Sequence, residues 1–329
     1  MGPGAAFVST GRLPTPEEVQ ASVDDAHARF RAVSDGRVSS VYPALARVDP
    51  AGFGVCLVGT SGAEYSSGDV DTPFTIMSVA KPFTFALVCE ALGPDAARLR
   101  VGVDATGLPF NSLEAVERSP DGRTNPMVNA GAIATTSFVP GSSPEDKWAG
   151  LLACLSGFAG RELALDDEVY ASASATNDRN RAIARLLHSF GRLGCDPDEA
   201  LDLYTRQSSV AVTARDLAVM GATLADGGVN PLTGERVIDA ALCHHVLAVM
   251  VIAGLYEISG DWFYQVGLPA KSGIGGGIVT VSPGKGGLGT YAPPLDAAGN
   301  SVRGQLAARY LSERVGLDLL ASRPAVPAH

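Results

Sequence analysis

The segment Phe74-Thr-Ile-Met-Ser-Val-Ala-Lys-Pro-Phe83 carries the most informative pattern of the chain, Ser78 followed three positions later by Lys81. Positions i and i+3 of a helix share one face, so we expect the serine hydroxyl and the lysine amine to lie within hydrogen-bonding reach. A serine hydroxyl becomes a good nucleophile when a neighbouring base takes its proton. A desolvated lysine near a second cation is neutral enough to act as that base. The pair therefore indicates serine acyl transfer.

A second motif, Lys271-Ser272-Gly273, stands far downstream at the start of a glycine-rich segment. A serine and a lysine three positions apart often occur by chance, so the first motif alone is weak. An S-x-x-K motif with a downstream lysine-serine/threonine-glycine motif is typical of acyl-transfer enzymes that use a serine nucleophile. The two motifs together predict such an enzyme.

The composition is that of a folded chain with a large core. Of the 329 residues, 46% are hydrophobic and 18% are charged, which suits one large α/β unit or two interlocked ones. The 25 Lys and Arg against 35 Asp and Glu give a net charge of −10. This charge counts against nucleic acid and anionic membranes as partners. The sequence contains no zinc-finger, RNA-binding or P-loop pattern.

The cysteines and the first residues favour a cytoplasmic protein. The five cysteines are dispersed and lack C-x-x-C spacing, so we expect reduced thiols. No basic region followed by an apolar run opens the chain, so we expect no signal peptide, and no stretch is apolar over a membrane-spanning length. We also expect no metal and no cofactor, because the histidines lack ligand spacing with carboxylates: His27, His188, His244, His245 and His329.

Local signals place helices and strands along the chain. Thr15 and the acidic turn after it predict an amphipathic helix over residues 16–30. The helix that carries the S-x-x-K motif is predicted to end at Leu92, where Gly93-Pro94 stops it. A hairpin is predicted over 53–66, helices over 143–156, 177–193, 196–207, from 216 toward 227, and over 304–315, and strands over 270–281 and 286–292.

The order of these elements predicts the architecture. Strands near both ends, with helices between them, predict one sheet built from both ends of the chain and an inserted helical unit. We expect a single domain over 16–318, made of a sheet subdomain (about 16–93 and 235–318) and a helical subdomain (about 94–234). Residues 1–15 are expected to be a disordered tail, and 319–329 a flexible one.

Polar clusters in Gly/Pro-rich loops carry the resemblance of this chain to a known family. They are Gly107-Leu-Pro-Phe-Asn-Ser112, Asn125-Pro-Met-Val-Asn-Ala-Gly-Ala-Ile133, Asn177-Asp-Arg-Asn180, Tyr204-Thr-Arg-Gln207, Gly254-Leu-Tyr256 and Gly267-Leu-Pro-Ala-Lys-Ser-Gly-Ile-Gly-Gly-Gly-Ile278. In this order and with these gaps they closely resemble the bacterial serine-dependent glutaminases of the β-lactamase-like superfamily. The resemblance runs from about residue 20 to 315.

The resemblance implies an α/β (α+β) fold of the β-lactamase/transpeptidase type, with a central antiparallel sheet flanked by helices and an inserted all-helical subdomain. It implies a role in glutamine metabolism: hydrolysis of L-glutamine to L-glutamate and ammonia, with Ser78 as nucleophile and Lys81 as base. It also implies a small-molecule substrate and a homodimer or homotetramer. The positions that match the family's substrate contacts are Ser78, Asn129, Asn180, Tyr204, Tyr256 and Ile274.

Expected roles in catalysis follow from the chemistry of amide hydrolysis. As Ser78 attacks the amide, negative charge builds on the carbonyl oxygen, and the backbone N–H groups of Ser78 and Ile274 are the expected stabilisers. Tyr256, or as the less favoured alternative Tyr204, is expected to pass a proton to the departing ammonia.

The remaining polar positions are expected to act through charge and hydrogen bonds. Lys271 is expected to hold Lys81 neutral by its positive charge and to attract the substrate's carboxylate, with Ser272 relaying protons beside it. Asn129 and Asn180 are expected to bind the substrate's α-carboxylate or amide. Without the resemblance, loop capping would be the commoner reading of such asparagines.

One departure from the family pattern concerns the substrate's α-ammonium. The motif around Val169-Tyr-Ala-Ser172 continues in the family with a glutamate that pairs with this ammonium, and here the position is Ala173. Leaving a ligand cation without its buried partner costs about 2–5 kcal/mol, so we expect weak glutamine binding or a substrate without a free α-amine. Candidates for a replacement carboxylate are Asp167, Glu168 and Asp178.

Two further departures lie near the motif and near the N-terminus. The family's Y-I-P segment corresponds to Val41-Tyr42-Pro43, and a one-residue shift in an extended segment points the ring away from the site. Pro82 directly follows Lys81, which is harmless only if the helix starts close to Ser78.

Three functions remain open at this point. The first is glutamine hydrolysis, and the second is a low-activity or inactive homologue that binds a glutamine-like metabolite. An amidase for substrates without a free α-amine is a variant of the first. The third, a β-lactamase-like or peptidase-like hydrolase, is disfavoured because such enzymes act outside the cytoplasm and no signal peptide is expected.

Overall fold

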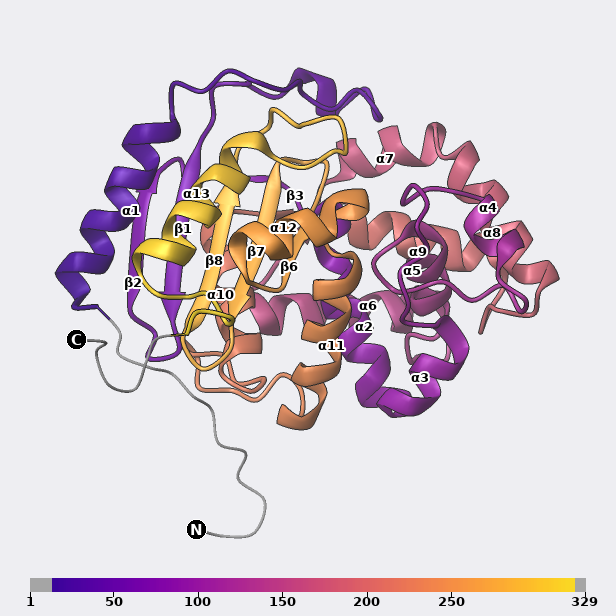
Figure 1. Cartoon of the computed structure of the whole chain (residues 1–329). Helices are drawn as coiled ribbons and strands as arrows, with labels where there is room; N and C mark the ends of the chain where they lie inside the picture. The colour runs from indigo at the N-terminus through magenta and orange to yellow at the C-terminus, as the bar shows by residue number, and fades with distance from the viewer. Residues whose placement is uncertain (1–13, 323–329) are drawn as a thin grey trace, which may run out of the picture.

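The computed structural model describes residues 14–322 as a mixed α/β arrangement of one large sheet with helices on both of its faces (Figure 1). Of the two expected tails, residues 1–13 and 323–329 lie outside the described residues.

The large sheet is antiparallel and joins the two ends of the chain. Its strand order is β2-β1-β8-β7-β6. The strands β1 (Gly54–Gly59) and β2 (Glu64–Gly68) form the expected hairpin, and the others are β6 (Ala270–Ser272), β7 (Gly277–Ser282) and β8 (Gly286–Tyr291). Because β1 pairs directly with β8, the expectation of one sheet built from both ends of the chain is confirmed.

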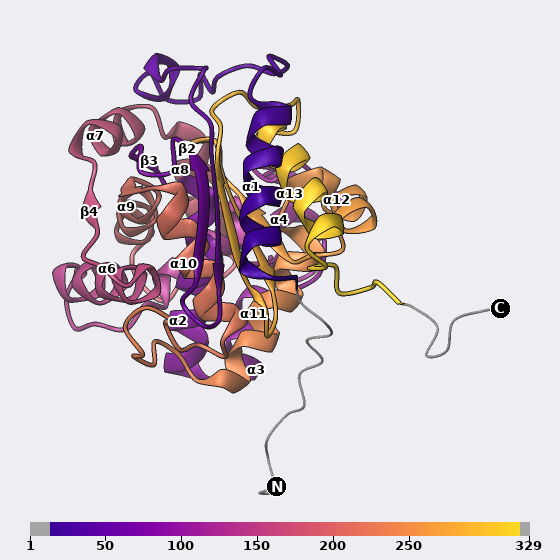
Figure 2. The ribbon, with the colours of Figure 1, turned by 90° about the vertical axis from the view of Figure 1, so that its left-hand side faces the viewer.

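One face of the sheet is covered by the first and last helices (Figure 2). The helix α1 (Pro16–Phe30) begins at Thr15, whose side chain forms a capping box with Glu18, and the expected bounds of this helix are confirmed. It packs beside α13 (Val302–Arg314), and α12 (Ser259–Val266) packs against α13. The apolar sides of these helices and of the sheet form one buried cluster, which fixes the outer layer.

The other face carries α10 (Ala214–Ala225), which crosses β8, β7 and β1. Two glycines of β8 make this close packing possible. A Cβ at Gly287 would lie 2.2 Å from the backbone nitrogen of Ala222, and one at Gly289 would lie 2.1 Å from the carbonyl oxygen of Ala214. The helix backbone therefore rests directly on the backbone of the strand.

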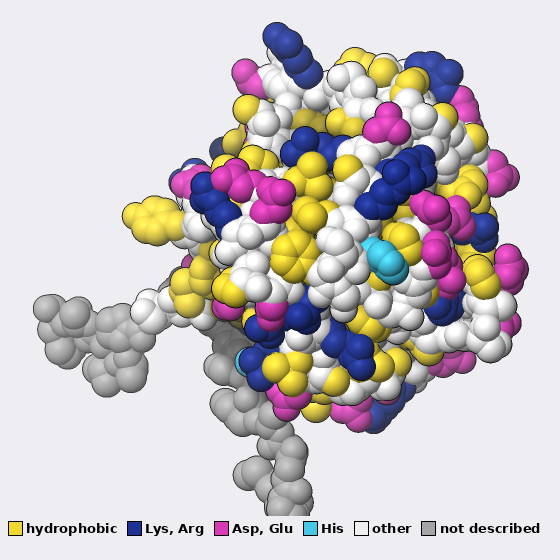
Figure 3. All heavy atoms as spheres, turned by 90° about the vertical axis from the view of Figure 1, so that its right-hand side faces the viewer, with side chains coloured by type: hydrophobic (Ala, Val, Ile, Leu, Met, Phe, Trp, Pro, Cys, Tyr) yellow, Lys and Arg dark blue, Asp and Glu magenta, His cyan; other side chains and the backbone are white. Residues whose placement is uncertain are grey.

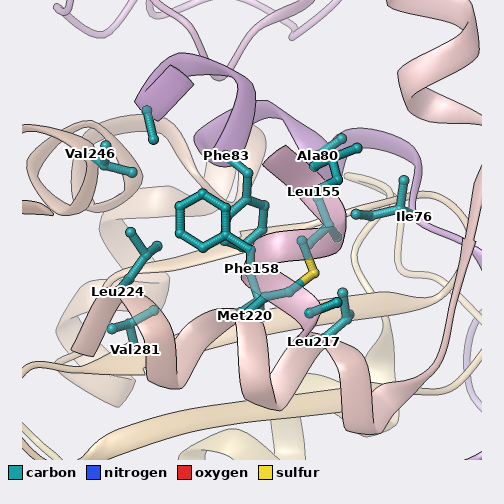
Figure 4. Close-up of a cluster of buried hydrophobic side chains, with 14 of the residues drawn as sticks. Ile76, Ala80, Phe83, Leu155, Phe158, Leu217, Met220, Leu224, Val246 and Val281 are labelled. Carbon is teal, nitrogen blue, oxygen red and sulfur yellow. The ribbon is translucent and has the colours of Figure 1, made fainter. Parts of the chain in front are cut away.

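The main core lies beyond α10, where α2 (Lys81–Leu92), α6 (Pro144–Ala159) and α11 (Ala240–Ala253) meet (Figure 4). Phe83 and Phe158 pack with ring centroids 4.8 Å apart, and Met220 and Val246 lie around them. All four side chains are fully buried. The expected end of α2 at Leu92 is confirmed, with Gly93 as its cap. The helix that starts at Lys81 is thus held by fully buried side chains of the main core.

The remaining helices form a group beside the sheet. They are α3 (Pro94–Val101), α4 (Glu114–Arg118), α5 (Asn129–Ser137), α7 (Asp167–Ala175), α8 (Asp178–Ser189) and α9 (Pro197–Ser208), with a small sheet of order β3-β5-β4 (Phe74–Thr75, Val210–Val212, Ala164–Leu165). The helix α10 falls within the predicted helical subdomain, about 94–234, yet it packs on the large sheet. The boundaries of the two subdomains stay a prediction. Acidic and basic side chains are interspersed over the outer face of this group (Figure 3).

One expected strand is wrong in its extent. The sequence predicts a continuous strand over 270–281, but the chain reverses between β6 and β7, which pair with each other. The N–H of Gly273 donates to the carbonyl of Gly277 at 2.9 Å, and Gly276 takes a φ of +94°. Glycine tolerates this left-handed backbone, so the glycine-rich run forms a turn instead of extending the strand.

Within residues 14–322, no single helix is long and apolar enough to cross a membrane. The segments Ala240–Ala253 and Tyr256–Val266 meet that length and composition only as a pair, and they are bent by 98°.

Candidate active site

Ser78 lies in a short 3-10 turn, η2 (Met77–Ala80), directly before α2. The expectation that Ser78 and Lys81 share one α-helix is therefore wrong: only Lys81 belongs to it. Met77 takes a φ of +48°, which L-residues rarely adopt and which no α-helix accommodates. Packing with Leu45 and Val169 holds the Met77 side chain in place. Backbone strain of this kind clusters at active sites.

Lys81 is buried at the first position of α2. Its Nζ donates to the Asn129 side-chain oxygen at 2.8 Å and to the Met127 carbonyl at 3.2 Å. Burial lowers the pKa of Lys81 to about 7. A neutral amine has two N–H donors and one lone pair. Because both donors have acceptors, the lone pair is left to accept a proton from a neighbour, although among the described residues no hydrogen bond joins Lys81 to Ser78.

Pro82 does not disturb this arrangement. Lys81 has ordinary helical angles, φ −54° and ψ −48°, and its N–H donates to the carbonyl of Ser78. Pro82 is the second residue of α2, where the backbone N–H has no partner within a helix in any case. The condition under which the sequence expects a harmless proline is therefore met.

A chain of side-chain amides fixes the wall of the site opposite Ser78. The Asn129 amide nitrogen donates to Asn180 at 2.9 Å, Asn180 donates to Asn177 at 2.7 Å, and Asn177 donates to Thr205 at 2.9 Å. The Thr205 hydroxyl donates to the carbonyl of Leu201 at 2.7 Å, inside α9. Each amide must then present its oxygen to the donor before it, so the orientation of all three is set.

Tyr204 joins this wall to the lysine. Its hydroxyl donates to the same Asn129 oxygen that accepts from Lys81, at 3.1 Å. Burial raises the pKa of Tyr204 well above its usual value. Tyr204 is therefore a neutral donor that fixes Asn129.

Tyr256 and Lys271 form the other side of the site. The Tyr256 hydroxyl donates to the carbonyl of Ser272 at 3.1 Å, and the Lys271 Nζ lies 4.1 Å from the centre of the Tyr256 ring. Burial raises the pKa of Tyr256 to about 12, and contacts with Ser78 and Ser272 oppose that rise. Tyr256 also takes a positive φ, 58°, so both non-glycine residues with this backbone in the described chain flank the site. Tyr256 therefore presents a protonated hydroxyl beside Ser78.

The charge of Lys271 acts differently from the expectation. Its Nζ donates to the carbonyls of Gly254 and Ser272, both at 2.8 Å, and no side-chain carboxylate of residues 14–322 accepts from it. Burial, and then the charge of Lys81, lower the pKa of Lys271 well below its usual value. The low pKa of Lys81 is itself caused by burial. Burial therefore drives both amines toward the neutral form.

The hydroxyl of Ser272 turns away from the serine and lysines. It donates to the side-chain oxygen of Asn300, and no hydrogen bond to Ser78, Lys81 or Lys271 is formed by this hydroxyl within residues 14–322. This geometry favours a role in holding the loop around Asn300 over the expected proton relay.

The turn after Lys271-Ser272 brings Ile274 to the nucleophile. A Cβ at Gly273 would lie 3.2 Å from the backbone nitrogen of Ser78, so the turn and η2 are in close contact. In the described part of the chain, neither the N–H of Ser78 nor that of Ile274 has a hydrogen-bond acceptor. Two free donors on neighbouring segments suit a developing oxyanion.

Ser78, Asn129, Asn180, Tyr204 and Ile274 line a cavity of about 120 Å³, whereas Tyr256 lines a neighbouring cavity of about 350 Å³ and the two lysines line neither. Sequence reasoning assigned no role to Phe110, Asn177 or Arg179, although they lie within the polar clusters that carry the family resemblance. The full lining of the 120 Å³ cavity is Val41, Tyr42, Met77, Ser78, Phe110, Asn111, Asn129, Thr176, Asn177, Arg179, Asn180, Tyr204, Ser208 and Ile274.

Tyr42 reaches this cavity, contrary to expectation. Residues 41–44 form a bend and a turn, so the alternation of side chains in an extended segment does not apply. Both Val41 and Tyr42 line the cavity. Tyr42 also lies near enough to Tyr204 to contribute to the raised pKa of that residue, after burial.

The three candidate replacement carboxylates do not line the cavity. Glu168 is paired with Arg47 on the surface, and Asp167 and Asp178 occupy exposed first positions of α7 and α8. Ala173 is buried within α7 and is not part of the lining.

No group of three or more His, Cys, Asp or Glu side chains suited to a metal ion exists among residues 14–322.

Comparison with known sequences gives long matches. The profile of the family described as Glutaminase matches residues 36–320. The chain is 64% identical to Glutaminase 2 of Yersinia pestis over 318 residues, which cover 97% of this chain and 94% of that protein. It is 49% identical to the Glutaminase of Colwellia psychrerythraea over 304 residues, covering 92% and 98% respectively.

Comparison with solved structures agrees. The structure described as "Probable glutaminase ybaS" matches with a TM-score of 0.91 and 45% identity, covering 93% of this chain and 99% of that one. Mglu in its glutamate form matches with a TM-score of 0.86 and 38% identity, covering 95% and 71%. The expected fold is thereby confirmed: a β-lactamase-like α/β fold with an antiparallel sheet flanked by helices.

Proposed function

Since the chain belongs to the glutaminase family and is a glutaminase hydrolase, we propose that it converts L-glutamine into L-glutamate and ammonia through an acyl-enzyme on Ser78. The observation that carries this mechanism is a cavity-lining serine that directly follows the strained Met77 and precedes, by three residues, a buried lysine whose pKa is lowered to about 7.

In the acylation step, the Ser78 Oγ attacks the side-chain amide carbon while its proton passes to the neutral Lys81. The carbonyl oxygen becomes negative and is held by the N–H groups of Ser78 and Ile274, which otherwise lack acceptors in the described chain. Removing one such donor typically lowers turnover by ~10²–10³-fold.

Ammonia leaves when the C–N bond breaks, and it needs one more proton to do so. Tyr256 gives that proton, because its hydroxyl stays protonated at neutral pH and lies beside Ser78. Tyr204 is the weaker alternative, since its hydroxyl is committed to Asn129. Before deacylation, Lys81 gives up the proton that it took from Ser78, which restores the hydroxyl of Tyr256 and makes the amine neutral again. A water molecule then gives a proton to Lys81 and attacks the ester carbon. When the ester C–O bond breaks, that proton returns to the Ser78 Oγ and glutamate leaves.

The amide chain from Asn129 to Asn177 orients the substrate. Asn129 and Asn180 line the cavity, and their partners hold them rigid, so they can hydrogen-bond the substrate without first losing side-chain freedom. Lys271, beneath Tyr256, fixes the ring of the proton donor.

The test is ammonia release from L-glutamine by the purified full chain and by Ser78→Ala. We expect the substitution to lower turnover by at least ~10³-fold, as loss of a catalytic nucleophile does. Ser61→Ala, in the exposed turn between β1 and β2, is the matched control and should leave turnover unchanged. Undiminished activity in Ser78→Ala would show that the nucleophile is misassigned.

A second candidate function is a low-activity homologue that binds a glutamine-like metabolite. Val41 and Ala173 favour it, because neither supplies a polar group at the positions where the family pattern has one. Binding of glutamine without ammonia release would support this candidate against the first.

Assembly as a homodimer or homotetramer and location in the cytoplasm remain proposals from the resemblance. Light scattering on the full chain as it elutes from a size-exclusion column measures the number of subunits directly.

A further inference from the structure

The charges around the cavity are of one sign. Among residues 14–322, the lining includes one guanidinium, that of Arg179, and no Asp or Glu. The Lys81 amine stands just behind the lining, hydrogen-bonded to Asn129, and in the neutral form that the mechanism requires it brings no counter-charge for a cation. The cavity therefore favours a carboxylate of the ligand, whereas a cation of the ligand has no opposite charge in the lining to pair with.

Two carboxylates stand on elements that also carry site residues, Glu257 beside Tyr256 and Asp202 on α9, and both have partners outside the cavity. Glu257 accepts from the backbone N–H of Phe110 at 3.1 Å and lines a neighbouring cavity of about 350 Å³ on the other side of that residue. Asp202 pairs with Arg206 and accepts from Tyr170. Neither of these carboxylates lines the 120 Å³ cavity.

From this charge pattern we propose that the site prefers small ω-amides that carry a carboxylate but no ammonium on the α-carbon, of the class of glutaramate, over L-glutamine. The inference rests on the proposed amide hydrolysis by Ser78. The hydrolysis of such an amide follows the same steps: the amide C–N bond breaks, a serine ester forms and ammonia leaves. Water then hydrolyses the ester to a dicarboxylate.

The physical reason is the cost of placing the α-ammonium of glutamine beside the Arg179 guanidinium, in a lining that offers no carboxylate to pair with it. An uncompensated charge of this kind lowers affinity by a factor of about 30 or more when it is fully buried. The cavity is partly open, so we expect a preference of about tenfold. Its volume of about 120 Å³ lies below the ~300–1,000 Å³ of pockets for drug-sized ligands, which favours compact amides over N-acylated glutamine.

The first experiment measures binding separately from turnover. Calorimetry on the full-length Ser78→Ala protein gives the Kd for glutaramate, L-glutamine and N-acetyl-L-glutamine. We expect glutaramate to bind about tenfold more tightly than either of the others. Equal or tighter binding of L-glutamine would overturn the inference, and so would tightest binding of N-acetyl-L-glutamine.

Hydrolysis by the unsubstituted protein distinguishes the two proposals. If the protein hydrolyses L-glutamine with a higher kcat/KM than glutaramate, the proposed function stands and the preference fails. If it hydrolyses neither amide but Ser78→Ala still binds glutaramate more tightly, the proposed function fails and the preference stands. The expected result is hydrolysis of both, with the higher kcat/KM for glutaramate.

A carboxylate introduced at the cavity wall should reverse the preference. Val41 lines the cavity and is 58% exposed, so Val41→Glu disturbs no core packing. We expect it to shift the ratio of kcat/KM for L-glutamine over glutaramate upward by at least about fivefold, whereas the neutral control Val41→Gln leaves the ratio unchanged. Ala173→Glu is a second variant, although its buried position makes folding less secure. An unchanged ratio in a folded Val41→Glu protein would contradict the inference.

Discussion

At the scale of single residues, the proposed mechanism depends on the protonation state of Lys81. Its ammonium form cannot accept a proton from Ser78, so activity requires the neutral amine. Because burial lowers the pKa of Lys81 to about 7, the neutral form grows as the pH rises through that value. We therefore expect kcat/KM to rise with pH, with an acid limb near pH 7.

Asn129→Asp tests this dependence. It places a carboxylate against the Lys81 Nζ, now 2.8 Å from the Asn129 oxygen, and an opposite charge at that distance favours the ammonium form. The acid limb of kcat/KM should move upward by about 1–3 pH units. Asn111→Asp, which adds the same charge to the cavity lining without a hydrogen bond to Lys81, should shift it much less. If the acid limb of kcat/KM lies at the same pH in the two variants, Lys81 is not the base.

The sequence predicts the main residues of this site but not how they are held. Ser78, Lys81 and Lys271 stand in short motifs, which can be read from neighbours in the chain. The hydrogen bonds of Asn129 to Asn180 and Tyr204 join residues 51 and 75 positions apart, so no local pattern reveals them. The bend that brings Tyr42 into the cavity is likewise invisible in its neighbours.

At the scale of elements, local chemistry predicts helix ends well and short strands poorly. Thr15 and Gly93 are correct boundaries because capping depends on the adjacent backbone. The strand over 270–281 is too long because the glycines at its centre, which permit a turn, do not require one in isolation. Strands of two or three residues such as β3 and β5 form only because their partners lie close in the fold.

Gly287→Ala tests the contact between α10 and the sheet. The added methyl would lie 2.2 Å from the Ala222 nitrogen, and the helix backbone cannot move aside as a side chain can. We expect a loss of about 2–3 kcal/mol in the free energy of unfolding, measured with urea. Gly260→Ala, where a Cβ would meet nothing within 4 Å, is the control and should change stability by less than about 1 kcal/mol. Equal effects of the two substitutions would mean that α10 does not rest on β8 as described.

At the scale of the whole molecule, the site draws on both ends and the middle of the chain. Lys271 comes from the sheet, Ser78 precedes α2 in the main core, and Asn129 belongs to the helical group. Burying Lys81 and Lys271 in this junction requires a neutral form that the unfolded chain does not favour at neutral pH. The catalytic arrangement thus lowers the stability of the fold.

Lys81→Met measures that effect through its pH dependence. The pKa of Lys81 is about 7 in the folded chain and about 10.4 when unfolded, so between these values the unfolded state binds more protons. Stability due to this residue therefore rises with pH through that window, by up to about 1.4 kcal/mol per pH unit. Relative to Lys81→Met, the unsubstituted protein should gain about 2 kcal/mol in unfolding free energy between pH 7 and pH 9. A difference that stays constant over this range would mean that Lys81 is not neutral in the folded state.

The central claim is that Ser78 carries the acyl group during turnover. The most direct measurement is mass spectrometry of the protein after acid quenching during hydrolysis of L-glutamine or glutaramate, followed by mapping of the modified peptide. We predict the mass increment of one acyl group on the peptide that contains Ser78, and its absence in Ser78→Ala. An acyl group on another residue, or steady ammonia release from the Ser78→Ala protein, would contradict the account.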